Sequence, residues 1–523
     1  MRYLVGFLVV VVSSVAAFAQ PPTNTKVLGK PDPEVHVPSA PVDLPAIPAF
    51  EMPASEPGFV GVHQLRVAGR KHLDTEVKVK GYVVWVYDCV LSAAKRGESR
   101  AATQKRIDAD PTICERAKFY LGQTAKEQPA IGLWIVDVPR PPNKLERERL
   151  PKEEIAAWPK VPKVKVGDFV VVTGKFAIAS PHAERNSDGL VVFAALEPAK
   201  KPPASKPAPP APPTARPAVA APGVKQVTLN PKDPAARDRS IKLSNEGTRA
   251  YGAKNHPEAI AAYTKAIAEW PGNHIAYYGL AGGHIGTKNW VAARDAMAKA
   301  LELEPNEPMY NMVYGYVLYE SAIAQAREAE AKKMNVKPDQ VSVDVSTINF
   351  DRALMHLAHA AKLEPGLWRA HYYIGRIHRD RGEARWAAES FDAALRSAPT
   401  DPGPWVALGE LYRTWHFTDQ AITVAKAGTA NVTRDASDVW YVLAMSYDDK
   451  RDYPKSIEAF TKALDAKPDN AKATFQRGQA LFRKGDFAKA KIDLEAYLAA
   501  ATGVSFAEAQ ANKMLLDIAA RKN

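Results

Sequence analysis

The chain carries two kinds of hydrophobic pattern, which divide it near residue 200. In the first part, apolar positions alternate with polar ones, most clearly around Val77, Val79, Val83, Trp85 and Tyr87. A period of two residues predicts a strand with one buried face. Further strands are expected at Ile131–Val138, Asp168–Phe176 and Leu190–Leu196. From residue 240 onwards, small and aromatic residues recur at a much longer interval, which predicts helical repeats.

The second part repeats itself at a period of about 34 residues. Four similar segments end in a proline, at Pro271, Pro305, Pro399 and Pro468. Eight residues before each proline stands a large apolar residue, namely Tyr263, Met297, Phe391 and Phe460. Small residues precede the prolines by twelve and by five positions, at Ala259, Ala293, Ala387, Ser456, Ala266, Ala300, Ala394 and Ala463. A fixed period of this length predicts a stack of helical hairpins, in which proline ends the second helix.

The first helix of each hairpin carries a small residue that allows a neighbouring helix to approach. Glycine occupies this position at Gly247, Gly315, Gly375, Gly409 and Gly478. Around Gly409 the spacing of Trp405, Leu408 and Tyr412 resembles the tetratricopeptide repeat family, and Trp440, Leu443 and Tyr447 repeat it with Ala444 in place of glycine. The resemblance implies an all-α superhelix (an α-α solenoid) of seven units, at 240–273, 274–307, 308–367, 368–401, 402–436, 437–470 and 471–504, followed by a capping helix at 505–523.

The third unit is longer than the others. An insertion covers about residues 320–348 within the repeat region 240–504. Its first part, Ala322–Lys333, is rich in Ala, Glu and Lys, and therefore predicts an extension of the first helix. Its second part, Lys337–Thr347, predicts a loop.

The resemblance also implies a binding surface, because five positions of each first helix line the concave face in this family. In this sequence they give a partner-binding groove that is aromatic at its start and cationic at its middle. Its candidate residues are Tyr278, Met312, Tyr316, Tyr319, Arg369, Tyr372, Arg376, Arg379, Arg413, Tyr441 and Phe475. Arginine clusters suit carboxylates and acidic peptides. The alternative is that Glu410, Asp448 and Asp449 pair with the arginines and leave no net field.

The first residues of the chain predict export. Met1 and Arg2 precede an apolar run, Tyr3–Val12, and a small-x-small sequence ends at Ala19, as in a secretory signal peptide at 1–19. An uncleaved anchor is the alternative interpretation. After cleavage no remaining segment is apolar and long enough to cross a membrane. We therefore expect an exported protein, periplasmic or secreted, whose partner is another envelope protein or a peptide segment.

Two proline-rich stretches predict extended connections between domains. Residues 20–57 form a Pro-rich disordered segment, and residues 198–234 form a Pro/Ala/Lys-rich linker. The formal net charge is +12. Much of it lies in the linker, at Lys200, Lys201, Lys206, Arg216 and Lys225. This placement argues against a basic groove for nucleic acid and favours a solvated tether, although loose attraction to an anionic surface stays open.

The β domain, 59–197, resembles the oligonucleotide/oligosaccharide-binding (OB) fold, a small five-stranded barrel. The resemblance implies a ligand face on the middle strands, with Tyr82, Trp134, Lys175 and Phe176 as candidates. Cys89 and Cys114 are the two cysteines of the chain. In an exported protein they predict one disulfide, which would staple an irregular or helical excursion from Leu91 to Gln123.

Residues with catalytic or metal-binding potential do not form a recognisable site. His378-Arg379-Asp380 spells a kinase tripeptide without the other kinase motifs. His356 and His359 are three residues apart on one predicted helix, but no acid or cysteine completes a metal site. We therefore expect no catalytic residue, no metal and no cofactor. The leading hypothesis is a non-enzymatic interaction scaffold of the bacterial cell envelope. A barrel that binds an envelope glycan or another anionic ligand while the repeats recruit a protein is the alternative, and an enzyme without motifs is a third.

Overall fold

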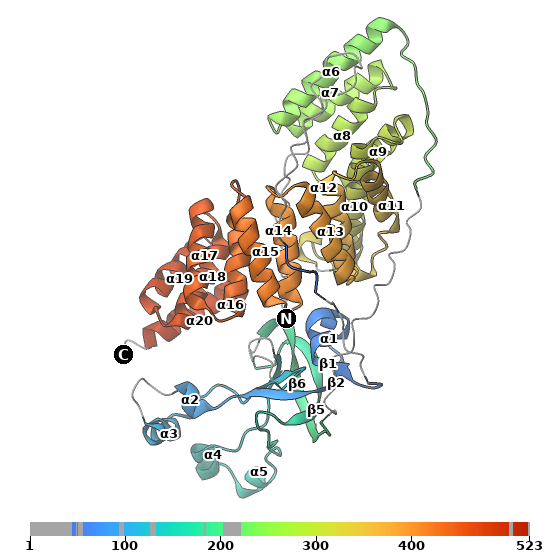
Figure 1. The fold of residues 1–523 in the computed structure, drawn as a ribbon. Helices are drawn as coiled ribbons and strands as arrows, with labels where there is room; N and C mark the ends of the chain where they lie inside the picture. Colours follow the sequence, from blue (N-terminus) through green and yellow to red (C-terminus); the bar gives the residue numbers. More distant parts are fainter. Residues whose placement is uncertain are drawn as a thin grey trace. The chain divides into compact units, whose positions relative to one another are not determined.

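The computed structural model describes residues 44–48, 50, 56–93, 99–125, 132–182, 185–201, 221–341, 343–500 and 506–520. The chain forms two compact units. One contains residues 49–213, and the other contains residues 214–523 together with residues 1–48. Figure 1 shows the first as a sheet with short helices and the second as a long helical array. The expected signal peptide and most of both proline-rich stretches lie outside the described residues.

The sheet unit confirms the predicted N-terminal β domain. Its strands are β1 Val60–Gly61, β2 Glu76–Val86, β3 Phe119–Gly122, β4 Leu133–Val136, β5 Phe169–Ala179 and β6 Arg185–Pro198. They pair in the order β1-β2-β3-β4-β6-β5, and β5 also pairs with β2. β4 and β6 run parallel, whereas β2–β3, β3–β4, β5–β6 and β2–β5 are antiparallel. Strands β2, β3, β4, β6 and β5 are therefore hydrogen-bonded in a closed ring, because β5 pairs with β2.

The alternating pattern of β2 determines which of its side chains pack into the core of the sheet unit. Val77, Val79 and Val83 are 4%, 0% and 0% exposed, whereas the charged residues between them face outwards. Helix α1, Val62–Ala68, adds Val62 to the same core. Gly81 lies against it, because a Cβ there would sit 2.8 Å from Cγ2 of Val62. β2 therefore needs a residue without a side chain at this point to pass beneath α1.

The predicted excursion from Leu91 to Gln123 is shorter than expected. It contains α2 Cys89–Ala93, α3 Arg100–Ala109 and a 3-10 turn, but its last residues form strand β3. The sequence prediction missed β3 because only Phe119 and Leu121 of its four residues carry the inward alternation. β1 is two residues long and was also missed. Between β4 and β5 lie the short helices α4 Lys144–Arg149 and α5 Lys152–Ala156.

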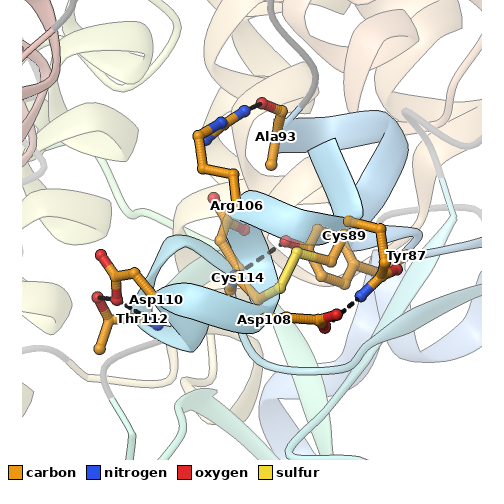
Figure 2. The surroundings of a disulfide bond; sticks show 10 residues. Tyr87, Cys89, Ala93, Arg106, Asp108, Asp110, Thr112 and Cys114 are labelled. Carbon is orange, nitrogen blue, oxygen red and sulfur yellow. Dashed lines mark hydrogen bonds between the residues drawn. A yellow bond between two sulfur atoms is a disulfide. The ribbon is translucent and has the colours of Figure 1, made fainter. Parts of the chain in front are cut away.

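The predicted disulfide is present in this excursion. Cys89, at the start of α2, bonds to Cys114, and their Cα atoms are 5.3 Å apart (Figure 2). Around it, Arg106 donates to the carbonyl of Ala93 at 2.6 Å, and the Tyr87 hydroxyl accepts from the Glu115 amide at 2.9 Å. The bridge therefore joins the start of α2 to the residue that follows the 3-10 turn, and it closes the excursion between β2 and β3.

The second unit consists of antiparallel helical hairpins and confirms the predicted α-α solenoid (Figure 1). Its helices are α6 Pro234–Gly252, α7 His256–Glu269, α8 His274–Gly286, α9 Trp290–Leu303, α10 Pro308–Met334, α11 Asp351–Leu363, α12 Trp368–Asp380, α13 Ala384–Ser397, α14 Pro402–Thr414, α15 Thr418–Asn431, α16 Ser437–Asp449, α17 Tyr453–Ala466, α18 Ala471–Lys484, α19 Phe487–Ala500 and α20 Phe506–Ala520. Many begin with an Asn or Asp cap. At α8, for example, the Asn273 side chain accepts from the amide of Ala276.

Glycine and aromatic positions of the repeat meet at Tyr263 and at Phe391. Tyr263 of α7 is 0% exposed and lies between α6 and α8. A Cβ on Gly247 or Gly279 would sit 2.8 or 2.2 Å from its ring. The same arrangement joins Gly375 to Phe391, at 2.5 Å. The expected role of the repeat glycines in close helix packing is therefore present in the structure.

The insertion of the third unit lengthens its first helix. α10 runs unbroken through Ala322–Lys333 and has 27 residues, twice the length of most of its neighbours. It ends at Asn335, which adopts a left-handed conformation with φ 52°. The chain then returns to α11 through two short 3-10 turns, at Pro338–Gln340 and Val345–Thr347.

The residues that precede α6 are fastened to the array. The amide of Val227 donates to the carbonyl of Glu302 at 2.7 Å, at the end of α9. The indole of Trp270, just after α7, donates to the carbonyl of Leu229 at 2.9 Å. We call residues 226–229 the anchor segment. It crosses from the end of α9 to the end of α7 before the first helix begins.

Candidate functional site

The eleven predicted groove residues all lie on the first helices of the hairpins. They belong to α8, α10, α12, α14, α16 and α18. These helices contact one another from one hairpin to the next, as in the pairs α10 and α12, α12 and α14, and α14 and α16. Close spacing of the first helices makes them the inner row of the array. We call their accessible side the inner surface.

Five of the predicted groove residues fill the core instead of facing a partner. Tyr278, Met312, Tyr316, Tyr319 and Phe475 are between 1% and 7% exposed. The physical reason is aromatic packing between hairpins. Tyr278 stacks on Tyr310 with 5.0 Å between ring centroids, and Phe475 lies 4.8 Å from Tyr497. Burial removes these five side chains from direct contact in this conformation, and their role in binding stays a prediction.

The other predicted groove residues keep accessible surface. Arg369, Tyr372 and Arg376 of α12 are half-buried, as are Arg413 of α14 and Tyr441 of α16, whereas Arg379 is exposed. Burial raises the pKa of Tyr441 to about 12, so its hydroxyl is neutral at physiological pH. The structure therefore places the accessible part of the predicted groove on α12, α14 and α16.

Three of the four predicted groove arginines are paired with acids. Arg376 lies 3.1 Å from Glu320, and its guanidinium is 4.9 Å from the centre of the Tyr319 ring. Arg413 bonds to Asp449 at 2.8 Å and Arg379 to Asp380 at 2.9 Å.

Asp448, one of the acids considered from the sequence, pairs with Arg483. The structure therefore favours the paired alternative over a groove with a strong positive field. Glu320 was missed as a partner, although its place one residue after Tyr319 would put it within reach of the next inner helix.

An aromatic group on α12 was only partly predicted. Tyr373 lies 4.6 Å from Tyr316 and 5.4 Å from Tyr372, between ring centroids. Trp368 lies 6.1 Å from Tyr372 and carries the Arg369 guanidinium 4.5 Å from its ring centre. We call Trp368, Tyr372 and Tyr373 the α12 aromatic cluster. All three residues are half-buried, and the Tyr373 ring is itself covered by Tyr316 and Arg376. Their spacing in W-x-x-x-Y-Y was the available sequence signal, since residues four apart share a helix face.

The four candidates on the sheet unit have different surroundings. Phe176 is 2% exposed and belongs to the core, so its prediction as a ligand contact is corrected by burial. Lys175 forms an exposed ion pair with Asp74 at 2.7 Å. Tyr82 packs on Phe169, with 4.7 Å between ring centroids. Trp134 is half-buried on β4.

Trp134 is part of a row of rings that the sequence prediction did not assemble. Tyr120 of β3 stacks on Trp134 at 5.3 Å with 9° between planes, and lies 4.7 Å from Trp85 of β2. The ammonium of Lys118 is 5.9 Å from the Trp134 ring centre and 2.7 Å from Glu115. We call Trp85, Tyr120 and Trp134 the sheet aromatic row. It depends on β3, which the sequence prediction placed inside the excursion.

Two of the three histidines singled out from the sequence, His356 and His378, have structural partners. Nδ1 of His356 lies 3.0 Å from Oδ1 of Asn311, and Nδ1 of His378 lies 2.5 Å from a Glu383 carboxylate oxygen. Among the described residues, no group of three or more His, Cys, Asp or Glu side chains could hold a metal ion. No helix in the described part of the chain combines the length and apolar character of a membrane span.

Comparison with known proteins supports the repeat assignment. Two family models described as "Tetratricopeptide repeat" match the array, one at residues 347–402 and 416–505 and the other at residues 250–315. No curated protein matches the sequence.

Among solved structures, the APC/C hetero-tetramer Cut9-Hcn1 is 15% identical with a TM-score of 0.37, and the match covers 54% of this chain and 54% of that chain. A tetratricopeptide repeat protein from Parabacteroides merdae is 12% identical, with coverages of 53% and 99% and a TM-score of 0.38. Pseudomonas aeruginosa pilF is 18% identical, with coverages of 47% and 97% and a TM-score of 0.35. On the repeat matches and its hairpin structure, the array of this chain belongs to the tetratricopeptide repeat family.

Proposed function

We propose that this protein is a non-enzymatic scaffold that holds a segment of another protein on the inner surface of its helical array. The observation that carries the proposal is the α12 aromatic cluster. Three half-buried rings lie on one inner helix, beside arginines whose charge is already paired. Partly exposed aromatic rings provide large contact area at low conformational cost. Neutral surroundings favour an apolar or weakly polar segment over a strongly acidic one.

Selection of binding peptides on the full-length chain tests this proposal. A displayed library of random peptides would be selected on the wild-type protein, and the affinities of the winners measured against Tyr372→Ala. We expect loss of about 1–2 kcal/mol of binding free energy, or roughly tenfold in Kd, because the ring belongs to the contact surface. Arg385→Ala on α13, an exposed residue of an outer helix, is the matched control. Winners that bind Tyr372→Ala and the wild type equally would reject the inner surface.

We also propose that the sheet unit is an OB-like barrel with a ligand face of its own. The five-strand ring of pairing, with β4 parallel to β6, supports the barrel. The sheet aromatic row crosses β2, β3 and β4, and stacked rings suit the faces of planar or sugar rings. An envelope glycan or another anionic ligand is the candidate, because the row supplies stacked rings and the Lys118 ammonium, which is paired with Glu115, lies beside it.

Intrinsic fluorescence would test this second role with defined oligosaccharides as probes. We expect a saturable change on titration of the wild type and its loss in Trp134→Ala. Trp158→Ala is the control, because that indole donates to the carbonyl of Arg140 and lies outside the row. Equal responses from both variants would contradict a ligand site at the row.

We propose an oxidising compartment outside the cytoplasm, periplasmic or secreted, as the location. The disulfide supports this, since such bonds persist where thiols are not kept reduced. Mass spectrometry of the protein isolated from its host would test it by measuring whether Cys89 and Cys114 are bridged and where the mature chain begins. Two reduced cysteines would contradict the proposal.

A further inference from the structure

A short N-terminal segment belongs to the helical unit and not to the sheet unit that follows it in sequence. Residues 44–48, Leu-Pro-Ala-Ile-Pro, form neither helix nor strand. They group with the array, whereas residues 49–213 group with the sheet. Leu44, Pro45, Ile47 and Pro48 are each partly covered. An extended five-residue segment buries little of itself, so other parts of the chain cover these side chains.

The composition of this segment restricts where it can be covered. None of its five residues carries a charge or a polar side chain. The outer helices of the array present charged pairs along their surfaces, such as Arg385 with Glu389 and Arg396 with Asp392 on α13. Covering such pairs with uncharged side chains gives little net stabilisation, because the hydration free energy that the ions lose offsets the gain from burying the apolar side chains. The outer surface is therefore a poor match.

The α12 aromatic cluster is a better match. Trp368, Tyr372 and Tyr373 form a group of half-buried rings on α12, and the neighbouring Arg376 is paired with Glu320. Proline-containing extended segments dock on aromatic surfaces in many recognition domains, because their conformation is already restricted and few hydrogen bonds are needed. The segment supplies two prolines and two branched aliphatic side chains for such a surface.

We infer that residues 44–48 occupy the inner surface at the α12 aromatic cluster and act as an intramolecular ligand. This inference rests on the proposed function of the same surface and adds its regulation. A tethered segment competes at a high effective concentration, so an external segment binds only by displacing it. The partner is accordingly an extended, uncharged segment that contains proline and aliphatic residues.

Photo-cross-linking in the full-length chain tests the location. A benzoylphenylalanine replaces Ile47, and mass spectrometry identifies the residues it reaches after irradiation. We expect cross-links to α12 and the inner helices beside it. The same probe at Val166, a residue of the sheet unit that is 64% exposed, is the control. Cross-links confined to residues 56–201, or no more than the control gives, would overturn the inference.

Competition tests the regulatory part. A synthetic labelled peptide of residues 41–50 is titrated against the full-length wild type and against the double variant Leu44→Asp, Ile47→Asp. We expect at least about tenfold tighter binding to the variant, because its own segment no longer competes. Val161→Asp, Val166→Asp is the matched control, with two exposed valines near a proline in the sheet unit, and should bind like the wild type. Equal affinity for all three proteins would overturn self-occupancy.

The two experiments separate this inference from the proposed function. Cross-links from position 47 to α12, together with a failure to select any external peptide even on the double variant Leu44→Asp, Ile47→Asp, would keep the inference and reject the scaffold. Selected peptides that depend on Tyr372, together with no cross-link to the array, would keep the scaffold and reject the inference.

Discussion

At the residue scale, a buried polar relay accompanies the small and aromatic residues of the repeat. The hydroxyl of Ser240 donates to the carbonyl of Ala266 at 2.6 Å, and Asn273 donates to Ser240 at 2.8 Å. The same two contacts recur among Ser437, Ala463 and Asn470, at 2.9 and 3.0 Å. The relay joins a first helix to its own second helix and to the start of the next hairpin, so it connects consecutive repeats.

Loss of the relay should destabilise the array. Asn273 is 3% exposed and also donates to Ser244 at 3.0 Å. We expect Asn273→Ala to lower the free energy of unfolding by about 2 kcal/mol, because buried serine oxygens lose their donor. Urea unfolding followed by circular dichroism measures this. Thr264→Ala, an exposed residue bonded only to its own helix, should change it little, and an equal effect of both variants would contradict the relay.

Glycine packing can be tested in the same unit. A Cβ on Gly375 would sit 2.5 Å from the Phe391 ring, whereas one on Gly366 would meet nothing within 4 Å. We therefore expect Gly375→Ala to cost about 2 kcal/mol through overpacking, and Gly366→Ala to be neutral or slightly stabilising. Thermal unfolding of both variants decides the matter. A stable Gly375→Ala protein would show that the hairpin can open at no cost.

At the element scale, the turn inside the hairpin shows what sequence patterns could and could not give. The repeat period predicted the hairpins and the buried aromatic positions, because both rest on residues that recur, and the composition of the insertion predicted the lengthened α10. The turn residue does not recur in type. Lys254, Lys288, His416 and Arg451 all adopt φ near 60° there, where other hairpins have Gly382 and Gly485. At these four residues, tertiary packing overrides the preference of non-glycine residues for negative φ. The residue type therefore gave no indication of the turn.

The candidate site was predicted less completely than the fold. Family positions placed every candidate on an inner helix, but they could not say which side chains would be covered. Tyr319 became core because Phe350, beyond the insertion, packs 5.0 Å from its ring. The sheet aromatic row needs the register of β3 against β2 and β4, which no alternation in four residues can specify.

A buried histidine links α10 to α11 and predicts a pH dependence. His356 is 2% exposed, and burial lowers its pKa to about 4 from the ordinary 6.5. The unfolded chain therefore binds more protons below pH 6.5, and stability falls as the pH drops from 6.5 towards 4, by up to about 3 kcal/mol.

Unfolding midpoints between pH 7.5 and pH 4.5 test this. We expect His356→Gln to flatten the dependence, because this titration is removed while a side chain that can contact Asn311 remains. The control, His371→Gln, changes a partly exposed histidine of α12 and should keep the wild-type slope. Identical slopes in all three proteins would contradict the assignment.

At the scale of the whole molecule, the two units should respond separately to reduction. The disulfide closes a loop with a sequence separation of 25 and lies entirely within the sheet unit. We expect the double variant Cys89→Ser, Cys114→Ser to destabilise that unit by about 3 kcal/mol. Hydrogen exchange should show faster exchange in β2 and β5 and unchanged exchange in α14–α18. Faster exchange in both units would contradict their independence.

The anchor segment determines how tension along the linker would enter the array. Its bonds to Glu302 and Trp270 lie ahead of α6 in the chain. A force applied from the N-terminal side therefore acts first on the ends of α9 and α7. It reaches α6 only after the hydrogen bonds of the anchor segment have broken. Because two hairpins share the load, the first helix is not peeled away from its end, where an array of repeats is weakest. The anchor segment thus protects α6 from mechanical unfolding, because it transfers force on the linker to two hairpins at once.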